Sequence, residues 1–105
     1  MNDLFTSTQT REVTAYRLSW KFIQRARRAY LPVPMPEPIK SNRTHAWIDA
    51  FDPGALELRS HADYLAHPDQ YAREQGYITP ADMATGRAAM LAFQRPETLA
   101  VEVTQ

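Results

Sequence analysis

Three histidines and three aspartates raise the question of metal binding or acid–base chemistry. They are His45, Asp49, His61, Asp63, His67 and Asp69. Helical metal sites place two histidines four residues apart, so that both rings project from one side of the helix. His61 and His67 are six residues apart, and His45 has only Asp49 at the helical distance. The spacing favours ordinary surface or capping histidines, so we expect no metal site and no cofactor.

Other catalytic arrangements lack their sequence signatures. No serine lies in the G-x-S-x-G motif that exposes a nucleophilic hydroxyl. The glycines, at positions 54, 76 and 86, are too far apart to form a loop that cradles phosphates. The chain has no cysteine, which excludes cysteine nucleophiles, disulfides and thiolate metal sites. We therefore expect no catalytic residues and a non-enzymatic protein.

Basic residues near the N-terminus form the strongest candidate binding surface. Residues 1–30 hold six basic and two acidic residues, whereas the rest holds six basic and ten acidic ones. Drawn as a helix, residues 13–30 place the basic side chains on one side and a wide apolar arc on the other. The predicted contact residues of this basic face are Arg17, Lys21, Arg25, Arg27 and Arg28.

A basic face on an otherwise acidic chain favours a protein partner, because complementary charge supplies specificity at protein interfaces. Tyrosine and arginine are frequent in binding hot spots, which makes Tyr64, Tyr71 and Tyr77 secondary candidates. We expect a non-enzymatic protein-binding module: an adaptor, a small subunit or an inhibitor of a larger complex. The alternative is nucleic-acid binding by the same face, where four phosphate contacts would give a salt slope of about −4.

The element expected to carry the basic face is a helix from Gln9 to Tyr30, preceded by the capping-box spacing of Thr6 and Gln9. Prolines at 32, 34, 36 and 38 end this helix and predict a stiff, extended connector. The predicted organisation is one domain over residues 1–105. It has a basic helix at 1–30, a proline-rich connector at 31–40, a helical body at 41–96 and a strand or tail at 97–105.

Residues 44–59 are ambiguous between a short helix and a hairpin. Trp47 and Phe51 are four apart, as on a helix face, whereas "DPG" is a turn signal and "LEL" alternates like a strand. Next, Ser60 and Asp63 have the spacing of a helix cap for "HADYLAH", and a further turn over residues 68–76 ends at a glycine.

The clearest helix start lies at Thr79, with Pro80 at the first helical position and Asp82 three residues after the cap. This pattern predicts a helix over residues 80–94. Its alanines and Gly86 would allow another helix to approach closely. Residues 97–105 alternate apolar and polar residues, as an edge strand would.

These elements predict a mainly α fold with a long N-terminal amphipathic helix, a connector and two to four shorter helices. The alternative is an α+β fold with a small antiparallel hairpin at 44–59 and a C-terminal edge strand. The absence of a long apolar segment and of a signal peptide predicts an intracellular, cytoplasmic protein with no membrane partner. A homodimer through the first helix or the C-terminal tail is left open.

Overall fold

A four-stranded antiparallel sheet organises the chain in the computed structural model, which describes residues 8–29, 34–67, 69, 74 and 79–104. The sheet is accompanied by three helices in this described part. In chain order the elements are β1 (Thr8–Ser19), α1 (Trp20–Arg28), β2 (Lys40–Ser41), β3 (His45–Asp49), α2 (Pro53–Ala66), α4 (Pro80–Gln94) and β4 (Glu97–Thr104).

The prediction of a mainly α fold with a long N-terminal helix is wrong, and the α+β alternative fits better. Residues 8–19 form a strand, and the helix that follows it, α1, is only nine residues long. The strand is rich in threonine, with Val13 and Tyr16, and such β-branched and aromatic side chains fit a pleated surface. The helix begins where Ser19 can cap it, because the Ser19 Oγ accepts a hydrogen bond from the Phe22 amide at 3.2 Å.

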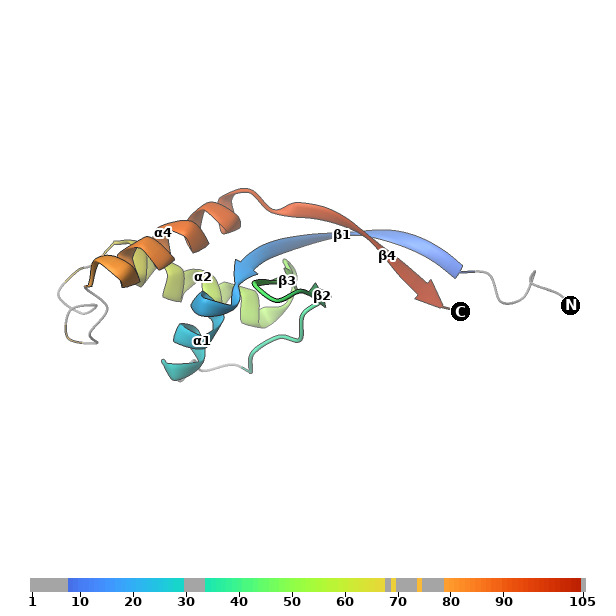
Figure 1. The fold of residues 1–105 in the computed structure, drawn as a ribbon. Helices are drawn as coiled ribbons and strands as arrows, with labels where there is room; N and C mark the ends of the chain where they lie inside the picture. Colours follow the sequence, from blue (N-terminus) through green and yellow to red (C-terminus); the bar gives the residue numbers. More distant parts are fainter. Residues whose placement is uncertain (1–7, 30–33, 68, 70–73, 75–78, 105) are drawn as a thin grey trace, which may run out of the picture.

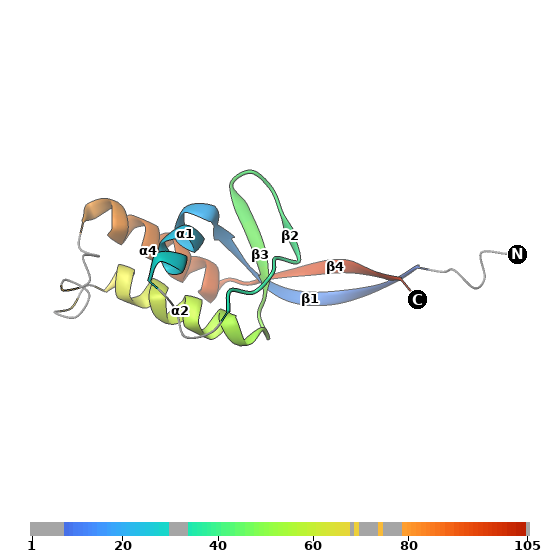
Figure 2. The same cartoon turned by 90° about the horizontal axis from the view of Figure 1, so that it is seen from below.

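The strands lie in the order β2-β3-β1-β4, so β1 is central and β4 is an edge strand. β1 pairs with β3 through residues 15–19 and with β4 through residues 8–15. From Thr8↔Thr104 to Thr14↔Thr98, β1 and β4 pair with each other alone among the described strands, over a length of about 23 Å. Figures 1 and 2 show this pair leaving the helical body as a two-stranded ribbon.

All three helices pack on one face of the sheet. Tyr16 on β1 lies against Phe93 on α4, with ring centroids 4.6 Å apart. The residues that share this face of the sheet, Leu18, Ala46 and Ile48, belong to the buried core. The helices contribute the rest of that core: Phe22, Ile23, Ala26, Ala55, Leu58, Ala62, Leu65, Ala89 and Phe93.

The hairpin lies earlier in the chain than residues 44–59. β2 and β3 are joined by a turn in which the Asn42 Oδ1 accepts hydrogen bonds from the amides of Thr44 at 2.9 Å and His45 at 2.8 Å. The "DPG" sequence starts a helix instead. Asp52 caps α2 by accepting from the Gly54 amide at 2.8 Å, and Pro53 occupies the first helical position.

The predicted helix over residues 80–94 is confirmed as α4, capped by Thr79, whose Oγ1 accepts from the Asp82 amide at 3.1 Å. Its predicted close approach to another helix is also confirmed, since Gly86 packs directly against the backbone of α2 at Leu65. The predicted helix start at Ser60 is wrong. Ser60 lies inside α2 and donates its hydroxyl to the Leu56 carbonyl at 3.2 Å.

The connector packs on the start of α2 instead of standing free. A methyl group at Gly54 would lie 2.7 Å from the Pro36 Cδ and 2.9 Å from the Pro34 carbonyl oxygen, so the two segments are in close contact. The connector then joins the sheet, where the Ile39 amide donates to the Trp47 carbonyl at 2.7 Å. None of the helices described here has the length and apolar character that crossing a membrane requires.

Candidate protein interface on the open face of the sheet

The five predicted basic residues do not form one surface. Arg17 lies on β1, on the face of the sheet away from the helices. Lys21, Arg27 and Arg28 are exposed on α1. Arg25 also lies on α1, but its guanidinium forms an ion pair with Asp82 on α4. The change of residues 8–19 from helix to strand explains the separation, because alternate residues of a strand point to opposite faces.

Of the three candidate tyrosines, only Tyr64 can be placed. It lies on α2, where 40% of its surface is exposed. Tyr71 and Tyr77 lie outside the described residues.

A buried polar cluster joins the three helices. Asp82 is 2% exposed, and its carboxylate receives the Arg25 guanidinium from α1 and the Thr79 hydroxyl at 2.8 Å. His61 on α2 is 3% exposed, and its ring lies 5.8 Å from that of Phe22. Since buried charges persist where they are paired and hydrogen-bonded, the buried Asp82 engages the partly exposed Arg25, and this ion pair contributes to the fold.

Burial of the His61 ring lowers its pKa below the usual 6.5, and the nearby positive charge of Arg25 lowers it further. The folded protein therefore favours the neutral imidazole. The stability that comes from keeping His61 neutral is fully present above pH 6.5. It is lost as the pH falls from 6.5 toward the lowered pKa of the folded protein, because the unfolded chain takes up the proton first.

We expect the His61→Gln variant to lose less stability than the wild type on acidification from pH 7.5 to 5.5. Chemical denaturation at the two pH values measures the difference. His67→Gln is the matched control, because His67 is exposed and should keep the wild-type fall in stability. An equal fall in the His61→Gln and wild-type proteins would contradict the assignment.

The face of the sheet away from the helices carries an ordered polar network around Trp47. We call this surface the open face; its residues include Arg11, Val13, Ala15, Arg17, Lys40, Trp47, Asp49, Glu97, Leu99 and Val101. The Trp47 indole on β3 extends across β1 and donates its Nε1 hydrogen to the Glu97 Oε2 on β4, at 2.8 Å. Ala15, which lies between these two residues on β1, is fully buried.

Two cations are held in place by this network. The Arg17 Nη1 lies 3.7 Å from the Glu97 Oε1, and the Arg17 side chain is 52% exposed. The Lys40 Nζ lies 4.4 Å from the centre of the Trp47 ring, within the range of a cation–π contact. Both charges remain accessible to a second molecule while each has a contact within the sheet.

The same face continues along the ribbon as an apolar strip. Val13 lies opposite Leu99, and Arg11 lies opposite Val101. Leu99 and Val101 are partly exposed, and no described helix covers this side of the ribbon. The open face therefore combines cations with two partly exposed apolar side chains, Leu99 and Val101, which is the mixed composition of protein interfaces.

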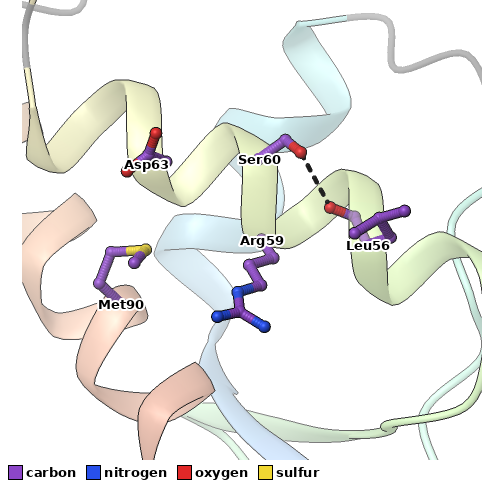
Figure 3. A pocket seen from close by; sticks show the side chains of 5 residues that line it. All are labelled: Leu56, Arg59, Ser60, Asp63 and Met90. Carbon is purple, nitrogen blue, oxygen red and sulfur yellow. Dashed lines mark hydrogen bonds between the residues drawn. The ribbon is translucent and has the colours of Figure 1, made fainter.

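A depression lies between α2 and α4, on the side of the sheet that the helices cover (Figure 3). It has a volume of about 320 Å³ and is lined by Leu56, Arg59, Ser60, Asp63 and Met90. Figure 3 shows the Arg59 side chain extending from α2 into the space beside β1 and α4. Ser60 bonds to its own helix and its neighbour His61 is buried, so this depression holds no serine with a histidine base.

Within the described ranges, no group of three histidine, cysteine, aspartate or glutamate residues is arranged to hold a metal ion. The sequence interpretation missed the roles of Lys40, Trp47 and Glu97, which come from three different strands. The available signal is the β-branched and aromatic content of residues 8–16, which favours a strand. The basic residues that follow also fit a helix with one basic side, which favours the wrong element.

Comparisons of the chain with models of protein families, with curated proteins and with solved structures find no match.

Proposed function

We propose that this chain is a non-enzymatic protein-binding module that binds its partner through the open face. The observation that carries the proposal is the network in which Trp47 and Glu97 position Arg17 and Lys40 beside the apolar strip. Ordered cations next to partly exposed apolar side chains suit a partner surface with carboxylates around an apolar centre.

The exposed basic residues of α1 give the nucleic-acid alternative less support. With Arg25 committed to Asp82, α1 offers three exposed cations, Lys21, Arg27 and Arg28. Neutralisation of three phosphates gives a salt slope of only about −2.7 and a weak affinity at physiological salt.

The test compares two variants that remove the same charge from different surfaces. Arg17→Gln with Lys40→Gln neutralises the open face, and Lys21→Gln with Arg28→Gln neutralises α1. Each is used as bait in a cell extract, and the affinity of any stoichiometric partner is then measured with purified protein. We expect the open-face variant to bind about tenfold more weakly or worse, and the α1 variant to bind like the wild type.

Equal affinity of the open-face variant and the wild type would overturn the proposal, as would the recovery of no stoichiometric partner. A gel shift of duplex DNA or RNA at low salt is the second arm, where we expect no retardation. Retardation that the α1 variant abolishes would replace protein binding with nucleic-acid binding.

A further inference from the structure

The outer edge of β4 presents an uninterrupted row of backbone donors and acceptors. β4 is eight residues long, is the edge strand of the sheet, and pairs with β1 in a continuous register without a bulge. Natural edge strands are protected by charged side chains, especially lysine, and by proline, bulges or shortness. β4 contains neither lysine nor proline, its two charged residues are Glu97 and Glu102, and it exceeds the usual strand length of about six residues.

The ribbon also lacks the support that a two-stranded sheet needs. A pair of strands alone is marginally stable in water, and a third strand or a covering layer is normally required. In residues 8–14 and 98–104, neither a third described strand nor a described helix supplies it. Addition of a strand to β4 would therefore stabilise the ribbon as well as satisfy its edge.

We propose that the occupant of this edge is β4 of a second copy of the chain, joined antiparallel to form a symmetric dimer. Opposed residues of an antiparallel pair lie on the same side of a sheet, so a two-fold axis must place one residue opposite its own copy. With Ala100 at the axis, Leu99 lies opposite Val101 of the other copy, and Thr98 lies opposite Glu102. Within residues 98–102 every apolar residue then meets an apolar one, and the next position along the strand places Val103 opposite Glu97.

The charges of β4 favour this arrangement over open-ended stacking. In a parallel, in-register pair each Glu102 would face the Glu102 of the next copy, and like charges directly opposite one another are destabilising. In the antiparallel pair about Ala100, Glu102 faces a threonine hydroxyl. The antiparallel pair is also closed by its two-fold axis, so it ends at a dimer instead of growing into a fibre.

The dimer goes beyond the proposed function, since it joins two chains through the backbone edge of β4, and of the open-face side chains only those of β4 itself, Leu99 and Val101 among them, meet across it. The axis stands perpendicular to the sheet, so both open faces lie on the same side of one eight-stranded sheet. The assembly would then offer two copies of the Arg17 and Lys40 pair to a partner, which raises avidity without any new contact.

Light scattering after size exclusion, over a hundredfold range of protein concentration up to millimolar, tests the dimer without any partner. The test variant is Ala100→Lys, which opposes two lysines at the axis. Thr10→Lys is the matched control. Within one chain, position 100 lies opposite Glu12 and position 10 lies opposite Glu102. Both variants therefore gain one lysine–glutamate pair between β1 and β4.

We expect the wild type and Thr10→Lys to approach twice the monomer mass, and Ala100→Lys to dissociate about tenfold more readily or worse. A wild type that stays monomeric throughout, or an Ala100→Lys variant that dimerises like the control, would overturn the proposal. Circular dichroism of each variant checks that the fold is kept.

A second measurement needs no charge change, because the chain has no native cysteine. Ala100→Cys should be linked to its own copy by a short bis-thiol reagent, since the opposed Cβ atoms would lie about 5 Å apart. Thr10→Cys should not be linked, because the two β1 strands would lie three strand spacings apart, about 14 Å. Equal linking of the two variants, or none, would contradict β4 pairing.

Discussion

Replacing Asp82 by alanine is expected to lower the free energy of unfolding by about 3 kcal/mol. The carboxylate is almost fully buried and is the shared acceptor for the Arg25 guanidinium and the Thr79 hydroxyl. Its loss removes a contact between α1 and α4 and leaves the guanidinium without its counterion. The cost stays below that of a fully buried pair because 35% of the Arg25 side chain is exposed and can regain water.

A double-mutant cycle separates this pair from the cap of α4. Arg25→Met leaves the buried carboxylate without its cation, so it should also destabilise the protein, by about 2 kcal/mol. Each single change leaves the other charge without its partner. The double variant should therefore lose at least about 1 kcal/mol less of the free energy of unfolding than the two single variants lose together. Additive effects in urea denaturation would show that the pair contributes nothing beyond the two separate side chains.

Gly86→Ala is expected to destabilise the protein by about 2 kcal/mol, although alanine is the better helix former. The added methyl would lie 2.5 Å from the Leu65 carbonyl carbon and 2.6 Å from the Ala66 amide nitrogen. Backbone atoms cannot move aside by changing rotamer, so α2 and α4 would have to separate. The melting temperature should fall by about 10 °C.

Ala84→Gly is the matched reverse exchange, at an exposed position of the same helix. It loses only helix propensity, about 1 kcal/mol, and should cost less than Gly86→Ala. If Gly86→Ala instead raised the melting temperature, alanine would fit between the helices and the close approach of α2 and α4 would be wrong.

The elements with local signals were predictable from the sequence. Thr79, Pro80 and Asp82 mark the start of α4 by their own hydrogen-bonding chemistry, which tertiary contacts leave unchanged. The C-terminal alternation likewise identifies β4. Both segments contain residues whose preferences agree with their final environment.

The prediction of a helix over residues 9–30 is wrong because two signals compete in this segment. Four basic residues, Arg17, Lys21, Arg25 and Arg28, share one side of an ideal helix, whereas the β-branched and aromatic residues before them favour a strand. The decision between strand and helix depends on β3 and β4, which pair with β1 from 26 or more residues away. The open face could not be predicted for the same reason, since β1 had first to be placed between Trp47 and Glu97.

The strand character of residues 8–19 underlies both the open face and the β4 edge, so the ribbon is the feature to measure. Nuclear magnetic resonance of labelled protein reports it directly through contacts between α-protons of opposed residues. We expect extended chemical shifts over 8–19 and such contacts from alternate pairs in the series Arg11–Val101, Glu12–Ala100 and Val13–Leu99. Helical shifts over residues 9–19 without these contacts would contradict the ribbon, the open face and the dimer together.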